Sequence, residues 1–143
     1  QPTLNSGFPL INPNQTRRDV SDFMHAMDSD LAPVVGQQVT LSADAGQRLA
    51  AWPRIDLLIQ RAKTPFVSKL LGGQVTECDL VAHTVENGLR RGFWFDAVAN
   101  AFVGSDGSRR TDAALRSLAN VAGQEVTYTC TPPGSGRRIA AVQ

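Results

Sequence analysis

The sequence lacks long apolar runs, an excess of charge of one sign, and any cysteine beyond two. No segment approaches the roughly 18 consecutive apolar residues that a membrane-spanning helix needs, so an integral membrane protein is not expected. Lysines and arginines number 14 against 13 aspartates and glutamates, and both signs are scattered along the chain. Such a surface has no general attraction for nucleic acid or an anionic membrane, and we expect neither as a partner.

Catalytic signatures are missing as well. The chain contains no G-x-S-x-G sequence, no CxxC pair and no CxxCH haem-attachment sequence. The stretch "GSGRR" lacks the strand–loop–helix context of a phosphate loop. Asp56, Asp79 and Asp96 each stand alone in strand-like runs, whereas acid–base catalysis needs two groups in different environments or a base beside a nucleophile. These absences favour a protein that is not an enzyme and that holds no cofactor.

The composition that is present fits a folded domain. Hydrophobic residues make up 42% and charged residues 19% of the 143 positions, which is ordinary for a soluble fold and unlike a disordered chain. The length is that of one domain. The chain begins at Gln1 without the charged and apolar regions of a signal peptide. We interpret it as a processed chain, a mature secreted product or a fragment of a longer protein.

The two cysteines, Cys78 and Cys130, lie in strand-like runs at positions that alternate with apolar residues, so both should face a core. Two readings remain open, a disulfide or two inert buried thiols. A disulfide would close a loop of roughly 50 residues and stabilise the fold by about 4 kcal/mol in the chain-entropy model. It would also favour an oxidising compartment, periplasmic or extracellular.

The N-terminal part divides into an arm and a helix. Residues 1–15 hold three prolines and show no period, which predicts an extended arm. Such an arm can reach a neighbouring chain by strand addition and so support a homo-oligomer or an extracellular assembly. Residues 16–28 follow with apolar side chains at helical spacing, which predicts an amphipathic helix with a partner-binding face. That face is formed by Val20, Phe23, Met24 and Met27.

The remaining chain predicts an α+β domain spanning residues 16–143, with an antiparallel β-meander, one packed helix, the N-terminal amphipathic helix and one disulfide. A β-sandwich with helical insertions is the alternative. Pro53 should end any helical turn before it. Expected strands begin near 37 and cover 54–62, 77–85, 91–98, 101–105 and 124–133, with a last one after 136. A loop is expected over 63–74, ending in a turn at Gly72 and Gly73, and another turn at Asn87 and Gly88. The packed helix is expected over 111–123, with Leu115, Leu118 and Val121 facing inward.

Histidine and methionine suggest a second kind of function. His25 lies between Met24 and Met27, and these residue types ligate copper or haem iron. Met24 and Met27 also complete the apolar stripe of the helix, which is the commoner use of methionine. His83 is the other histidine, and we expect it on the solvent-facing side of its strand. With Asp79 or Asp96 it could alternatively bind zinc, although the spacing matches no known ligand set. A small copper-binding redox protein is therefore an alternative hypothesis.

The tryptophans suggest a third kind of function. Phe93 and Phe95 should share one face of a strand, which leaves Trp94 on the other. An exposed Trp94, together with Trp52, could stack on sugar rings. A carbohydrate-binding module is the corresponding hypothesis, and packing of the same rings is the simpler one.

An ordered series of segments resembles a known context. The series is "FMHAMDSDLAPVVGQQVTL", "RIDLLIQRA", "CDLVAH", "RGFWFD" and "SLANVAGQEVTYTCTPPGSGRRI", and the resemblance covers residues 15 to about 139. It is similar to a segment that directly follows a c-type cytochrome domain of the peroxidase-like kind in large secreted or periplasmic bacterial proteins. The resemblance implies that helix 16–28 closes the cytochrome fold and that a separate β-rich module follows. Because CxxCH is absent here, haem ligation is carried over to no residue.

The first reading is therefore a non-catalytic accessory or interaction module of an exported bacterial redox protein. Its expected partner is a c-type cytochrome domain or subunit.

Overall fold

The computed structural model describes Arg18 and residues 30–141. The chain divides into two units, Gln1–Asp30 and Leu31–Gln143, and the fold below belongs to the second. The expected arm over 1–15 and, apart from Arg18, the expected helix over 16–28 lie outside the described residues. Within the part that is described, no helix is long and apolar enough to cross a membrane.

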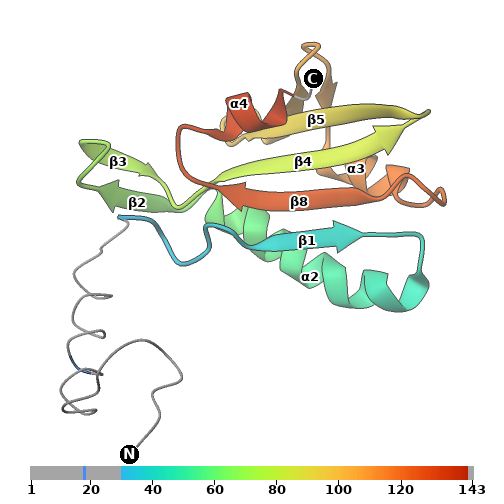
Figure 1. Cartoon of the computed structure of the whole chain (residues 1–143), viewed down its shortest axis with the longest axis horizontal. Helices are drawn as coiled ribbons and strands as arrows, with labels where there is room; N and C mark the ends of the chain where they lie inside the picture. Colours follow the sequence, from blue (N-terminus) through green and yellow to red (C-terminus); the bar gives the residue numbers. More distant parts are fainter. Residues whose placement is uncertain (1–17, 19–29, 142–143) are drawn as a thin grey trace, which may run out of the picture. The chain divides into compact units, whose positions relative to one another are not determined.

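An antiparallel sheet of six strands forms the centre of the fold (Figure 1), and its order is β1-β8-β4-β5-β6-β7. Strands β4 to β7 are consecutive neighbours, whereas β8 returns to lie between β1 and β4. A hairpin of β2 and β3 makes a separate two-stranded sheet. The strands are β1 (Gln38–Leu41), β2 (Pro65–Ser68), β3 (Gly73–Thr76), β4 (Asp79–Glu86), β5 (Leu89–Asp96), β6 (Ala101–Gly104), β7 (Arg109–Arg110) and β8 (Val126–Thr131). The predicted α+β class and its antiparallel meander are confirmed.

Three helices accompany the sheet: α2 (Ala45–Arg61), α3 (Asp112–Leu118) and α4 (Gly136–Ala140). Helices α2 and α3 pack on one face, where the core lies, and α4 lies against β4 and β5 on the other. Figure 1 shows α2 running alongside β1 at the edge of the sheet.

The core forms where alternate strand positions meet the two larger helices. Side chains that alternate along a strand point to opposite faces, so each strand contributes every second residue. Phe102 is central, with its ring centroid 5.1 Å from that of Phe95 and 5.8 Å from that of Tyr128. Phe93 and Phe95 share this face and Trp94 takes the other, as predicted. The cluster comprises Val39, Leu41, Ala51, Ile55, Leu58, Ala62, Cys78, Leu80, Ala82, Phe93, Phe95, Phe102, Leu115, Ala119, Val126, Tyr128 and Cys130.

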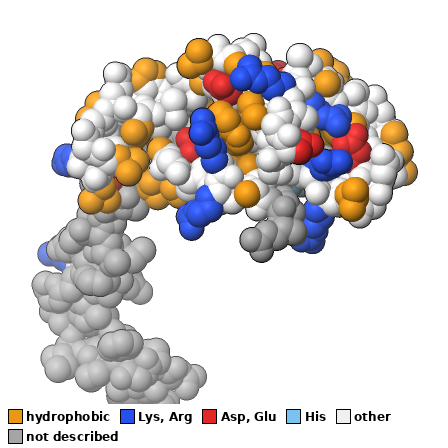
Figure 2. Space-filling model, turned by 90° about the horizontal axis from the view of Figure 1, so that it is seen from above, with side chains coloured by type: hydrophobic (Ala, Val, Ile, Leu, Met, Phe, Trp, Pro, Cys, Tyr) orange, Lys and Arg blue, Asp and Glu red, His pale blue; other side chains and the backbone are white. Residues whose placement is uncertain are grey.

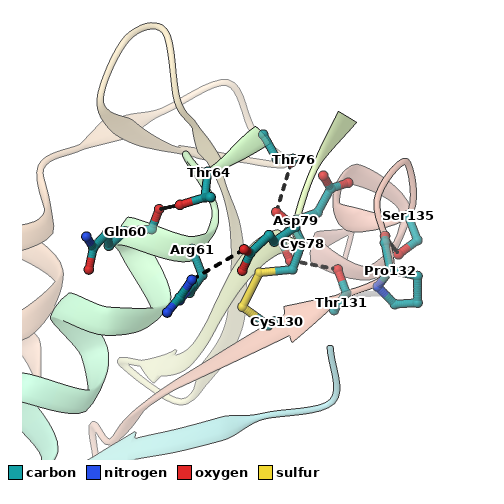
Figure 3. Close-up of a disulfide and its surroundings, with 11 residues drawn as sticks. Gln60, Arg61, Thr64, Thr76, Cys78, Asp79, Cys130, Thr131, Pro132 and Ser135 are labelled. Carbon is teal, nitrogen blue, oxygen red and sulfur yellow. Dashed lines mark hydrogen bonds and ion pairs between the residues drawn. A yellow bond between two sulfur atoms is a disulfide. The ribbon is translucent and has the colours of Figure 1, made fainter. Parts of the chain in front are cut away.

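The disulfide expected between Cys78 and Cys130 is present, and the alternative of two free thiols is set aside. It joins residues 52 apart in sequence, at the entry of β4 and near the end of β8, with a Cα–Cα distance of 5.4 Å. Figure 3 shows hydrogen bonds on either side of it. Thr76 Oγ1 donates to the Cys78 carbonyl oxygen at 3.1 Å, and Thr131 Oγ1 donates to the Asp79 carbonyl oxygen at 2.9 Å. The bridge therefore links the start of β4 to the end of β8 at one end of the sheet.

Helix α2 replaces two predicted elements and is the largest correction. The strand expected over 54–62 is wrong, and so is the stop expected at Pro53, which lies inside the helix. Ile55, Leu57 and Ile59 do alternate, but the positions that bury themselves are Ala51, Ile55 and Leu58, at the helical spacing of four and three. Pro53 is exposed, so the carbonyl it leaves without a helical partner can be hydrated. Packing of the inner face outweighs the cost of the proline, about 3 kcal/mol.

Helix α3 confirms the predicted packed helix, but it is shorter than expected. Thr111 caps it, because its side chain accepts a hydrogen bond from the Ala114 N–H at 3.2 Å. Leu115 is fully buried, as predicted. The helix ends at Leu118, and Val121, which was expected to face inward, is 53% exposed. The Val121 N–H instead donates to the Leu118 carbonyl oxygen, in a turn that precedes β8.

Helix α4 replaces the predicted last strand. Asp79 Oδ2, on β4, accepts hydrogen bonds from the N–H groups of Gly134 and Gly136 at 2.9 and 2.8 Å. This contact fixes the turn that starts α4 and gives Asp79 a structural role. A Cβ on Gly136 would lie 2.7 Å from the Asp79 Cβ, so the approach requires glycine. Since the stabilising contact comes from far along the chain, the local pattern could not predict the helix.

The hairpin of β2 and β3 replaces the predicted loop over 63–74. Its register pairs Phe66 with Val75 and Ser68 with Gly73. The predicted turn at Gly72 and Gly73 is present, and both residues have positive φ. The error was to treat the flanking residues as loop, since strands of four residues carry little periodic signal.

Candidate interaction surface on helix α2

The outward side of α2 carries large apolar side chains that the fold leaves uncovered. Leu49 is 82% exposed, Trp52 50% and Leu57 46%. Leu49, Pro53 and Leu57 are four positions apart and so form one row along the helix, with Trp52 beside it. Ala51, Ile55 and Leu58 use the opposite side for the core. We call Leu49, Trp52, Pro53 and Leu57 the α2 apolar surface.

This surface borders a shallow, open depression of about 590 Å³. Its lining consists of Ala45, Arg48, Leu49, Trp52, Pro53 and Asp56. Arg48 is already engaged, since its Nε donates to the Ser42 carbonyl oxygen and its Nη2 to that of Ala119. The polar atoms at the rim are thus largely satisfied within the chain, and the part left for a ligand is apolar. Contiguous exposed apolar area of this kind is typical of protein–protein contact sites.

An ion-pair network holds Trp52 in place. The guanidinium of Arg116, on α3, lies 5.5 Å from the Trp52 ring centroid. Arg116 Nη2 donates to Asp56 Oδ1 at 2.5 Å and to Asp112 Oδ2 at 2.9 Å. Burial alone would lower the pKa of Arg116, but hydrogen bonds and charge from Asp112 and Asp56 outweigh it and raise that pKa. The guanidinium of Arg116 thus lies beside the Trp52 ring while it is bound to both carboxylates.

The residues expected for copper or zinc do not come together in the described part of the chain. His25, Met24 and Met27 lie outside the described residues. His83 Nε2 lies 3.1 Å from the Ile139 carbonyl oxygen, so this nitrogen is used to hold α4. His83 was expected on a solvent-facing side of its strand, but α4 covers that side and leaves it half-buried. Among residues 30–141, no group of three or more His, Cys, Asp or Glu side chains could hold a metal ion.

The two tryptophans expected for sugar stacking lie on different sides of the molecule. Trp94 faces α4, and the Arg137 guanidinium covers its ring at 4.3 Å from the centroid. Trp52 is on α2, which packs against the other face of the sheet. The structure therefore does not bring the two rings into one platform. The partner-binding residues predicted on helix 16–28, Val20 and Phe23 with the two methionines, lie outside the described residues.

Charges on the described surface are mixed. In the view from above in Figure 2, Lys and Arg side chains lie among acidic and apolar ones and do not form a continuous basic area. Ion pairs account for part of this pattern, since Arg91 bonds Asp106 and Arg110 bonds Glu86, each at 2.9 Å. Hydrogen bonds from Ser108, the largest cause, and the charge of Arg91 lower the pKa of Asp106.

Sequence reasoning missed Leu49, Pro53 and Leu57 because it divided α2 into a loop or short helical turn before Pro53 and a strand after it. The signal that could have found them is the spacing of Ala51, Ile55, Leu58 and Ala62, which marks a helical inner face and leaves the apolar residues between them outside.

Comparisons with protein-family models, with curated proteins and with solved structures found no match to this chain.

Proposed function

We propose that this chain is a non-catalytic interaction module of an exported bacterial redox protein, and that it docks a c-type cytochrome domain through the α2 apolar surface. The observation that carries the proposal is the row of Leu49, Pro53 and Leu57 with Trp52 beside it, exposed on a helix whose other side is fully packed. Tryptophan at the centre of an apolar area is a frequent anchor of protein interfaces.

The size of the surface indicates a weak and reversible contact. Covering the exposed parts of Leu49, Trp52 and Leu57 would contribute about 4 kcal/mol. Association costs at least about that much, so this surface alone does not hold a permanent complex. Small interfaces are typical of redox partners that meet and separate. The predicted helix over 16–28, with Val20, Phe23, Met24 and Met27 on its apolar face, is the proposed second contact.

The disulfide is consistent with the proposed location. A bridge between Cys78 and Cys130 persists in the oxidising surroundings of the periplasm or the extracellular space. The resemblance of residues 15–139 to segments that follow a cytochrome domain supports the same compartment and partner. Homo-oligomerisation through the arm over 1–15 is part of the same proposal, as a further route to assembly.

The test is a titration of the chain with a purified c-type cytochrome domain of the peroxidase-like kind from the source bacterium, followed by calorimetry. We expect saturable binding that the double substitution Leu49→Ser and Trp52→Ser weakens by about tenfold or more. The matched control is Val98→Ser, since Val98 is 99% exposed in the turn between β5 and β6. Binding that is absent, or that the double variant and the control weaken equally, would contradict the proposal.

A further inference from the structure

Among the residues that the structure describes, strand β1 forms one edge of the six-stranded sheet and pairs on one side only, with β8. Its register pairs Val39 with Tyr128 and Leu41 with Val126. The Cys130 N–H donates to the Gln37 carbonyl oxygen at 3.0 Å, which marks a hydrogen-bonded position in this ladder. Because such positions alternate in antiparallel pairs, the N–H and C=O groups of Gln38 and Thr40 point away from β8. These groups are the pairing sites of a further strand.

The two edges of the sheet differ in protection. Strand β7, at the far edge, is only two residues long and consists of Arg109 and Arg110. Short, charged edges of this kind resist pairing with other chains. Strand β1 has the sequence QVTL, with no charge, no proline and twice the length. An uncharged edge strand of this length, in a sheet whose other edge is short and charged, is the form that strand addition uses.

Figure 1 shows helix α2 running along this edge. A groove lined by residues of β1 and α2 lies between them. The groove encloses about 240 Å³. It is lined by Gln38, Val39, Thr40, Gln47, Ala50, Ala51 and Arg54. Ala50 is exposed, and its small side chain leaves room for the side chains of an added strand. Arg54 is exposed and forms no ion pair with any described residue, and the lining contains no acidic side chain.

We infer that the groove between β1 and α2 binds an extended peptide segment that pairs antiparallel with β1 and places a carboxylate beside Arg54. Backbone bonds to Gln38 and Thr40 would supply affinity, and the charge of Arg54 would supply preference for an acidic segment. A second copy that pairs through its own β1 fits less well, because that strand has the sequence QVTL and brings no acidic side chain to Arg54. The site is separate from the α2 apolar surface, since neither Leu49 nor Trp52 lines it.

The probe is a capped peptide of alternating threonine and valine with one central glutamate, compared with a twin that carries lysine instead. Fluorescence polarisation with the whole chain gives both affinities. We expect the glutamate peptide to bind about fivefold more tightly than the lysine peptide. Arg54→Glu should reverse this preference. Arg109→Glu is the matched control, because it changes net charge equally at the opposite edge and should leave the preference unchanged.

A backbone variant tests the pairing itself. Thr40→Pro removes an N–H that points to the free edge while the ladder to β8 keeps its bonds, so both peptides should bind about tenfold more weakly or not at all. Circular dichroism and intact disulfide mass establish that this variant is folded. The inference is overturned if neither peptide binds the unaltered chain below about 1 mM. It is also overturned if Thr40→Pro binds as well as the parent, or if the chain forms dimers that Thr40→Pro abolishes.

Discussion

Removing the disulfide is the perturbation whose size follows most directly from the structure. The bridge between Cys78 and Cys130 closes a loop of 52 residues. In the chain-entropy model a loop of this length stabilises the folded state by about 4 kcal/mol. Both sulfurs are buried, so each Cys→Ala change also removes packing, which costs about 1 kcal/mol per site. Since small domains unfold with only about 5–15 kcal/mol, the loss would leave the chain marginally stable.

The assay is urea unfolding followed by tryptophan fluorescence. Cys78→Ala, Cys130→Ala and the double variant are measured in reductant, and the parent is measured without reductant. Either single variant should lose about 5 kcal/mol, because it loses the cross-link and one sulfur. The second substitution should remove only about 1 kcal/mol more. The slope with urea should increase, because the unfolded chain without a cross-link exposes more surface. A single variant that loses less than about 1 kcal/mol, or a second substitution as costly as the first, would refute the reasoning.

Three further predictions concern the core, the α4 turn and pH. Ile55→Ala should lower the free energy of unfolding by about 2–5 kcal/mol, because Ile55 is fully buried. Leu49→Ala, on the exposed side of α2, should change it by less than about 0.5 kcal/mol. Equal losses in urea unfolding would contradict the assignment of the two sides of the helix. Gly136→Ala should cost about 1–3 kcal/mol because the new Cβ meets Asp79, and an unchanged melting curve would show that the turn is not tight. Burial raises the pKa of Tyr128 above its ordinary value, so its contribution to stability is complete below about pH 10 and is lost as the pH rises above that value. The fall in the free energy of unfolding above pH 10 should therefore be smaller in Tyr128→Phe than in the parent. Tyrosinate absorbance that appears at the ordinary pKa of tyrosine in the folded parent would contradict this prediction.

Strands β4, β5, β6 and β8 and the burial of the two cysteines could be predicted from the sequence because alternation along a strand is a local signal. Alternation placed Phe93 and Phe95 on one face, and the Asn87–Gly88 pair marked the hairpin between β4 and β5. Both of those turn residues have positive φ, as a two-residue hairpin requires. The same alternation placed Cys78 and Cys130 in the core.

Helix α2 could not be predicted in the same way, because its apolar residues fit both the period of a strand and that of a helix. Ile55, Leu57 and Ile59 match a strand, and a proline at 53 argues against a helix. Tertiary packing of Ala51 and Leu58 decides the outcome. The candidate surface was lost with the helix, since exposed residues can be recognised only once the buried face is known.

Helix α4 could not be predicted for a second reason, which is that distant residues determine it. Its start depends on the Asp79 carboxylate, which lies more than fifty residues earlier in the chain, and its end on the contact between His83 and the Ile139 carbonyl oxygen. Neither contact leaves a periodic signal near residues 136–140. The same two residues had been considered for metal binding, and in the structure each serves to hold this helix.

The most direct test of the proposed function is hydroxyl-radical footprinting of the chain with and without a peroxidase-like c-type cytochrome domain. If the α2 apolar surface is the docking site, oxidation of Trp52 and Leu49 should fall in the complex while that of Val98 stays unchanged. A complex that forms with Trp52 and Leu49 as reactive as in the free chain would contradict the account.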